Sequence, residues 1–313
     1  MSDQAAPGAA PDASRPASAA RGPAVPEPAE AETRTYPGPE RVTEDAMAPF
    51  PAAALAAALG EAAPWPAAGR ALPAFWHWLH FHEPAAAETI GRDGHLATGG
   101  FIPAPGLPRR MWAGSDVDFV APLTLGRPAR RRSRVLSLVH KKGRSGPMAL
   151  ITVEHRIEGA ASDGWRHALT ERQNLVFLED RVPGAPGRPP AAAPADETRA
   201  RRWCMDPPLL FRYSALTWNG HRIHYDADYC REIEGYPGLV VHGPLLATLL
   251  LHLAAEHRPD RHRDGFVGAF SFRAEAPVFA GERFETCLRE QDDGLMLWVR
   301  GSDGRLAMRA TLI

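Results

Sequence analysis

The chain has 313 residues, which is enough for two modest domains with a sizeable core. Its 36 basic and 37 acidic residues give a formal net charge of -1, so the composition excludes a strong overall field for nucleic acid or for an acidic membrane. The three cysteines are widely spaced and odd in number; they predict no disulfide framework and no zinc pair, which indicates a reducing compartment. The sequence shows no signal peptide or membrane span, and we expect a soluble, cytoplasmic protein.

Residues 1–41 are mainly Ala, Pro, Ser and Glu and contain almost no large apolar side chains. Such a segment buries too little surface to offset its ordering entropy, so we predict a disordered tail, with a docking role as the alternative. A new pattern begins at Thr43, which is suited to cap a helix with Glu44 and Asp45 in its first turn. This pattern predicts a helix that stops at Gly60.

The rest of the N-terminal half reads as a sheet. Residues 109–178 alternate apolar and polar side chains around Gly-rich turns, which predicts antiparallel strands. Before them lies FWHWLHFHE at 75–83, which we interpret as a packed domain edge, with the wall of an acyl pocket as the alternative. We predict an N-terminal domain at 42–180, followed by an extended, solvated Pro-rich linker at 181–200.

The C-terminal part, 201–313, begins with PLLFRYSALT at 208–217, which we interpret as a strand. A short helix follows at 226–234, and then an apolar helix at 243–257 whose polar stripe is so narrow that protein must surround it. Four short strands separated by Asp-Gly turns complete the chain. A buried helix followed by a curled antiparallel sheet describes a hot-dog. Because both halves share this element order, we predict an α+β double hot-dog with two antiparallel sheets, each wrapping a helix.

The stretch SALTWNGHRIHYD at 214–226 carries many titratable groups where the predicted strand ends. Together with YPGLVVHGPLLATLL at 236–250, it resembles the MaoC-like, type-2 hydratases and dehydratases of acyl thioesters. Within that group the likeness is greatest to the double hot-dog hydratases of mesaconyl-C4-CoA and itaconyl-CoA. The segments MWAGSDVDF and KKGRSGPMALITVEH resemble the N-terminal, dehydratase-like half of the same proteins. The resemblance therefore covers about residues 42–313.

The family motif has an aspartate followed five residues later by a histidine. In this chain the histidine position is His224, whereas the aspartate position holds Asn219. An amide orients water by hydrogen bonds but cannot act as a carboxylic acid, so the two-residue scheme of the family does not carry over intact. We expect His224, with a pKa near 6.5, to activate water and to return the proton, while Asn219 positions that water. A structural role for His224 is the alternative.

The resemblance also assigns Gly243 to the oxyanion hole, where backbone N–H groups at a helix start stabilise the developing enolate. Four neighbours are candidates for substrate contacts: His221, Tyr225, His242 and Arg222. For His221 and His242 a structural role is the alternative. The spacing of the histidines matches no zinc pattern, so we expect no metal, and no cofactor apart from the coenzyme A of the substrate. Asp226 is expected to cap the helix that follows it.

The resemblance implies an acyl-CoA hydratase that adds water to a short, branched dicarboxylic acyl-CoA, namely mesaconyl-C4-CoA or itaconyl-CoA, giving citramalyl-CoA. Arg212 and Arg222 are candidates for binding the free carboxylate. One alternative is a 3-hydroxyacyl-thioester dehydratase of fatty acid or polyketide synthesis. Another is a non-catalytic acyl-thioester-binding subunit, an option that Asn219 leaves open. We expect acyl-CoA as the ligand, no nucleic acid or membrane partner, and a homodimer as one option for assembly.

Overall fold

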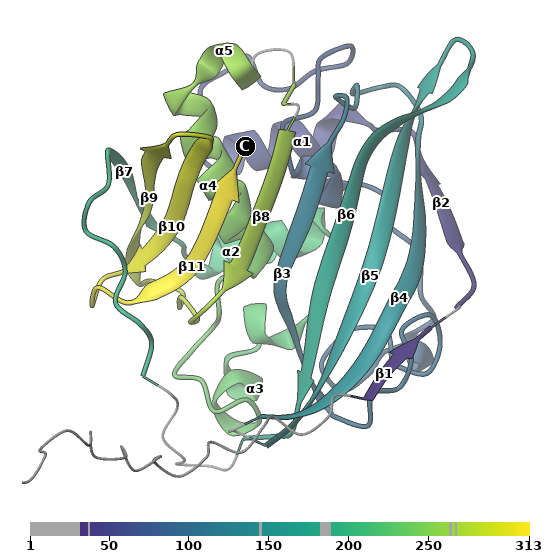
Figure 1. Cartoon of the computed structure of the whole chain (residues 1–313), viewed down its shortest axis with the longest axis vertical. Coiled ribbons are helices and arrows are strands. Elements are labelled where there is room, and N and C mark those ends of the chain that lie inside the picture. Colours follow the sequence, from purple (N-terminus) through teal and green to yellow (C-terminus); the bar gives the residue numbers. More distant parts are fainter. Residues whose placement is uncertain (1–31, 37, 144–145, 182–188, 263–264, 267) are drawn as a thin grey trace, which may run out of the picture. The chain divides into compact units, whose positions relative to one another are not determined.

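The computed structural model describes residues 32–36, 38–143, 146–181, 189–262, 265–266 and 268–313. Within them, eleven strands form one antiparallel sheet in the order β1-β4-β5-β6-β3-β8-β11-β10-β9-β7, and β2 also pairs with β4 (Figure 1). No helix of this described part is long and apolar enough to cross a membrane.

The N-terminal half supplies six strands and one α-helix. The strands are β1 (Glu32–Thr35), β2 (Arg41–Asp45), β3 (Arg109–Phe119), β4 (Ala129–Gly143), β5 (Gly146–Ala161) and β6 (Gly164–Leu178), and the helix is α1 (Pro49–Ala58). Two 3-10 turns lie between α1 and β3, η1 (Trp76–Leu79) and η2 (Ala87–Thr89).

The C-terminal half supplies five strands and most of the helices. Its strands are β7 (Arg199–Cys204), β8 (Gly268–Ala274), β9 (Arg283–Gln291), β10 (Gly294–Gly301) and β11 (Leu306–Leu312). Its helices are α2 (Pro207–Leu216), α3 (Ala227–Glu232), α4 (Gly243–His257) and α5 (Pro259–His262), with the 3-10 turn η3 (Arg222–His224) between α2 and α3.

The two halves meet where β3 pairs with β8, from Gly114 opposite Arg273 to Phe119 opposite Gly268. At Gly114 the strands approach so closely that a Cβ atom would lie 2.1 Å from the carbonyl oxygen of Phe272, so only glycine fits there. The fold is a double hot-dog, as predicted. This pairing joins the two predicted antiparallel sheets edge to edge into one continuous sheet.

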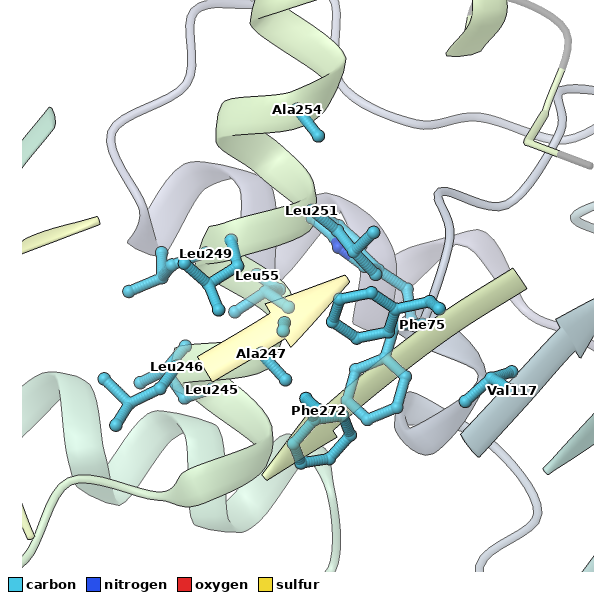
Figure 2. Packing of buried hydrophobic residues seen from close by; sticks show 14 of the residues in the cluster. Leu55, Phe75, Val117, Leu245, Leu246, Ala247, Leu249, Leu251, Ala254 and Phe272 are labelled. Atoms are coloured by element: carbon cyan, nitrogen blue, oxygen red, sulfur yellow. The ribbon is translucent and has the colours of Figure 1, made fainter. Parts of the chain in front are cut away.

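A single core runs across the two halves. Helix α4 lies behind the C-terminal strands in Figure 1, and its leucines are almost completely buried. Figure 2 shows Leu245 and Leu249 of α4 in the same cluster as Leu55 of α1, together with Phe75 and Phe272. The apolar character of α4 on nearly every side is therefore explained by its position at the centre of this core.

The predicted helix start at Thr43 is wrong. Residues Arg41–Asp45 form β2, which pairs with β4, and the helix begins only at Pro49. The carboxylate of Asp45 serves the strand end instead: it accepts hydrogen bonds from the backbone N–H groups of Met47 (2.6 Å) and Phe81 (3.0 Å). Pairing with a neighbouring strand has outweighed the local capping signal. The helix does end where predicted, just before Gly60, which has a φ of 78°.

The predicted strand at 208–217 is also wrong, because this segment is α2. Asp206 caps the helix by accepting a hydrogen bond from the backbone N–H of Leu209 at 2.9 Å, and a proline stands in the first turn. Leu210, Tyr213 and Ser214 are buried at helical spacing. The titratable side chains of the motif SALTWNGHRIHYD therefore follow the end of a helix and not the end of a strand.

Two predicted boundaries change as well. The predicted tail 1–41 is too long, because Glu32–Thr35 pairs with β4; residues 1–31 lie outside the described part. In the predicted linker 181–200, the described residues from 189 onward are fixed to the C-terminal strands. Ala193 donates its N–H to Gly304 at 2.8 Å, and Glu197 pairs with Arg300.

Most of the cluster at 75–83 is a packed edge of the core. Phe75, Trp76, Leu79 and Phe81 are buried in the core, as expected for a packed edge. Trp78 differs from them, because its side chain lines a large cavity.

Candidate active site

A cavity of about 970 Å³ is lined by residues from both halves of the chain. Its volume is in the range typical of small-molecule sites. Its wall includes Trp78, His95 and Arg110 from the N-terminal half and Asn219, His224 and Gly243 from the C-terminal half. The structure thus brings the three residues assigned to catalysis to one cavity.

The loop after α2 presents the histidine motif to this cavity. Trp218 adopts the left-handed conformation, with a φ of 53°, and turns the chain away from the helix. The side-chain oxygen of Asn219 then accepts a hydrogen bond from the backbone N–H of His221 at 3.0 Å, which fixes the next turn. The chain enters η3, which ends at His224, and Asp226 caps α3 by accepting from the N–H of Tyr229 at 2.9 Å, as predicted.

His224 is held as a neutral imidazole with one nitrogen free. Its Nδ1 lies 2.7 Å from the carbonyl oxygen of Val240, and because a carbonyl only accepts, Nδ1 carries the proton. Nε2 has no partner among the described residues, and the side chain faces the cavity. Burial holds the pKa of His224 well below its usual value, and the neighbouring His221 lowers it further. The ring is therefore a proton acceptor at neutral pH.

His242 supports His224 and does not reach the cavity. Its side chain is fully buried, and it is absent from the described cavity wall. Nε2 of His242 lies 2.8 Å from the hydroxyl oxygen of Ser214, and Tyr213 packs edge-on against the ring. Burial lowers the pKa of His242 well below its usual value. The substrate contact predicted for His242 is not supported by this position.

Gly243 begins α4 at the edge of the cavity. A Cβ atom built on Gly243 would meet no protein atom within 4 Å, so the space beside its backbone is open. Its backbone N–H has no acceptor among the residues that the structure describes, and it lies at the positive end of the α4 dipole. This is a suitable place for a group that develops negative charge.

Two of the remaining candidates lie elsewhere. Arg222 is engaged by Asp226, with its Nη2 2.7 Å from the carboxylate, and the hydroxyl of Tyr225 donates to the carbonyl of Gly220 at 3.0 Å. Neither lines the cavity, and neither does the exposed Arg212. The substrate contacts predicted for Arg222 and Tyr225, and the carboxylate-binding role suggested for Arg212 and Arg222, are not supported by these positions. His221 does line the cavity, and it is only 6 % exposed.

The structure adds a loop that the sequence did not point to. Asp93 accepts two hydrogen bonds from His95, one from its backbone N–H (3.1 Å) and one from Nδ1 (3.0 Å). The rings of His95 and His221 are 4.6 Å apart. The contact is tight at the backbone too, since a Cβ atom on Gly94 would lie 1.9 Å from the carbonyl oxygen of Gly220. No local sequence signal links these segments, because they are far apart in the chain.

Asp93, His95 and His221 have ligand atoms within 4.8 Å of one another, which is a spacing that a metal ion requires. Both oxygens of Asp93 are, however, already engaged by His95. We interpret this group as a hydrogen-bonded pair that shapes the cavity wall, and we derive no step through a metal.

The hairpin predicted at KKGRSG (141–146) is present between β4 and β5, with Gly143 opposite Gly146; residues 144–145 lie outside the described part. Lys141 and Lys142 are exposed, and neither belongs to the described cavity wall.

Comparison with known proteins agrees with this arrangement. A family model described as hydroxyacyl-thioester dehydratase type 2 matches residues 75–280. The chain is 41 % identical over 274 residues to the mesaconyl-C(4)-CoA hydratase of Chloroflexus aurantiacus, covering 86 % of this chain and 93 % of that protein. It is 26 % identical to the mitochondrial hydroxyacyl-thioester dehydratase type 2 of Schizosaccharomyces pombe, covering 72 % and 79 % of the two chains.

Solved structures show the same fold. HtdX of Mycobacterium tuberculosis is similar with a TM-score of 0.58 at 17 % identity, covering 88 % of this chain and 99 % of that one. A MaoC-like dehydratase from Phytophthora capsici is similar with a TM-score of 0.60 at 12 % identity, covering 88 % and 95 %. From the matched family model and the similarity to the Chloroflexus protein, we conclude that the chain belongs to the hydroxyacyl-thioester dehydratase type 2 family and is an enzyme of the hydratase–dehydratase type.

Proposed function

We propose that this enzyme adds water to the α,β-double bond of a short, branched dicarboxylic acyl-CoA, with mesaconyl-C4-CoA as the preferred substrate. The observation that carries the proposal is the free Nε2 of His224, which faces a cavity that the N-terminal end of α4 also reaches. The name and the 41 % identity of the Chloroflexus relative support the choice of substrate.

In this proposal His224 is the general base. Nε2 removes a proton from water while the water oxygen bonds to the β-carbon, and the electrons of the double bond move onto the thioester carbonyl. The N–H of Gly243 and the dipole of α4 stabilise the resulting enolate oxygen. Because the pKa of His224 is lowered, its imidazolium form is a strong acid and readily returns the proton to the α-carbon.

Asn219 has a place in the same scheme. Its Oδ1 is occupied by the N–H of His221, which leaves its NH₂ group as a donor for the attacking water. The amide thus holds the loop with one atom and orients water with the other.

The experiment is turnover of a small panel: mesaconyl-C4-CoA, itaconyl-CoA and the straight-chain crotonyl-CoA. We expect the dicarboxylic substrates to have the higher kcat/KM. The same machinery runs in reverse, and the name of the Schizosaccharomyces pombe relative favours dehydration as a second candidate function. A clear preference for crotonyl-CoA and for dehydration of its hydrated product would establish that candidate. Tight binding without any turnover would instead indicate a binding subunit.

A further inference from the structure

Two arginines of the cavity wall, Arg110 and Arg181, form no salt bridge within the described residues, and of these two Arg110 has a buried nitrogen without a hydrogen-bond partner. We propose that Arg110 binds the free carboxylate of the acyl chain and so selects dicarboxylic acyl thioesters over straight-chain ones. This inference deepens the proposed function and rests on it for the identity of the substrate.

The position of Arg110 in β3 directs it into the cavity. The preceding Arg109 is paired with a buried carboxylate, with Nε 2.8 Å from Glu234. Arg110 lines the cavity instead, with its guanidinium 5.2 Å from the ring centre of Phe177 on the paired strand β6. The two adjacent arginines therefore have different surroundings, one satisfied by the protein and one not.

The polar contacts of Arg110 are few for a guanidinium with five N–H donors. Nη2 donates to the carbonyl of Leu96 at 3.3 Å, and Nε is buried without a partner. Within the described residues, no carboxylate oxygen lies within 4.0 Å of its nitrogens. The negative charge of Asp93 raises the pKa of Arg110, but both carboxylate oxygens of Asp93 accept hydrogen bonds from His95.

Such an arrangement is costly unless a ligand completes it. Burial lowers the pKa of Arg110, which reflects the loss of hydration of its charge. The side chain of Arg110 is partly exposed, but its Nε is buried, and burying part of a charged group without a hydrogen-bonded counter-ion destabilises a protein. A carboxylate bound in bidentate fashion matches the guanidinium in shape and charge. The wall that holds Arg110 also holds His95 and His221, whose pKa values Arg110 lowers, so the cation lies close to the histidine motif.

Another arginine of the cavity wall, Arg305, has carboxylate partners within the protein. Arg305 lies 2.6 Å from Glu282 and 2.8 Å from Asp303, and it also donates to the carbonyl of Pro277 at 2.9 Å. Its charge is neutralised by the protein itself, so it has no need of a substrate carboxylate. Arg110 is the cavity-lining arginine that combines a buried unsatisfied nitrogen with the absence of a carboxylate contact in the described structure.

The first test compares kcat/KM for mesaconyl-C4-CoA and crotonyl-CoA in wild type, Arg110→Gln and Arg110→Lys. We expect Arg110→Gln to lose about 100-fold or more on the dicarboxylic substrate, mainly through KM, and to stay within about threefold on crotonyl-CoA. Lysine keeps the charge but not the fork, so Arg110→Lys should recover part of the loss. Arg166→Gln, which removes an exposed cation outside the described cavity wall, is the matched control and should change neither value. Equal losses on both substrates would overturn the proposal.

A binding measurement separates this inference from the proposed hydration. Succinyl-CoA and butyryl-CoA have the same number of acyl carbons, cannot be hydrated, and differ by one terminal carboxylate. Wild type should bind succinyl-CoA about tenfold or more tightly than butyryl-CoA, and Arg110→Gln should abolish that difference. If the difference appears but no dicarboxylic enoyl-CoA is turned over, the proposed function fails and the role of Arg110 stands. If wild type does not prefer succinyl-CoA, the role of Arg110 is wrong.

Discussion

The rings of His224 and His242 stack with their centroids 3.6 Å apart and their planes 20° from parallel. The hydroxyl of Ser214 holds His242 from one side, and the carbonyl of Val240 holds Nδ1 of His224 from the other. His224 is thus oriented by a second imidazole and a backbone carbonyl, and no carboxylate of the described residues forms a hydrogen bond or ion pair with it. His224 is therefore the single group to which we assign proton acceptance.

Replacing His224 by alanine should lower kcat by about 100-fold or more, because it removes the nitrogen to which we assign proton transfer. The melting temperature should change little, since a cavity already lies beside the side chain. Steady-state kinetics together with thermal unfolding tests this. Tyr225→Phe, in a neighbouring but exposed side chain, is the control. Activity of His224→Ala within about threefold of wild type would refute the assignment.

The pH dependence of kcat/KM should follow the lowered pKa of His224. The sequence led us to expect a limb near pH 6.5, but burial moves the pKa of this ring well below that value. The neutral ring is the active form, so the rate should stay constant from about pH 8 to about pH 6.5 and fall only at more acidic pH. A rate profile measured in several buffers checks this. A midpoint at or above the ordinary histidine pKa, or a second limb on the basic side, would contradict a single buried base.

Two substitutions at Asn219 separate its two contacts. Aspartate keeps an oxygen that accepts from the N–H of His221 but loses the NH₂ donor, whereas alanine loses both. We expect Asn219→Asp to keep the wild-type melting temperature and to lose kcat, and Asn219→Ala to lose both stability and kcat. If Asn219→Asp is as active as wild type, the donor group is not needed and the carboxylate chemistry of the wider family operates in this site.

Stability should decrease as the pH falls below about 6.5. Burial lowers the pKa values of His221, His224 and His242 well below their usual value and that of His155 to about 4. The unfolded chain then binds protons that the folded chain does not, so each histidine reduces the free energy of unfolding by roughly 1 kcal/mol between about pH 7.5 and about pH 5.5. Urea unfolding at both pH values measures this. His155→Gln should reduce the slope, and a stability independent of pH in this window would show that these rings are not held neutral.

The N-terminal boundary offers a prediction of a different kind. A chain that starts at Glu32 keeps β1, whereas one that starts at Val42 loses β1 and the first residue of β2. We expect the shorter chain to have a melting temperature lower by several degrees, because β4 loses backbone hydrogen bonds along its edge. Differential scanning calorimetry of the two proteins decides this. Identical melting temperatures would mean that β1 contributes nothing to stability.

Elements with a clean periodicity could be predicted from the sequence. The buried helix α4, the hairpin β4–β5 and the cap at Asp226 depend on local patterns, and the structure confirms each of them. The segment 208–217 could not be assigned by its apolar residues alone, since a short apolar run is compatible with a strand and with a helix. The stronger signal was Asp206 followed by proline, which is typical of a helix start.

The cavity was harder to predict than the motif. His224, Asn219 and Gly243 lie in or beside two continuous motifs, so a resemblance reaches them. His95 and Arg110 lie in the same cavity wall as the motif although they are more than 100 residues away from it in sequence, and no spacing in the chain encodes that proximity. The suggested carboxylate ligands, Arg212 and Arg222, were chosen for nearness in sequence, and the structure places both outside the cavity wall.

The pairing of β3 with β8 determines how this enzyme can be recombined with its relatives. One half of the chain carries the cation that we assign to acyl selection, and the other carries the histidine that we assign to water activation. A chimera that exchanges one half of the chain with a relative would therefore change acyl preference and leave the hydration chemistry in place. This requires that glycine is kept at Gly114, where β8 approaches β3 closely. Any larger residue at that position would push the strands apart and misalign both parts of the cavity at once.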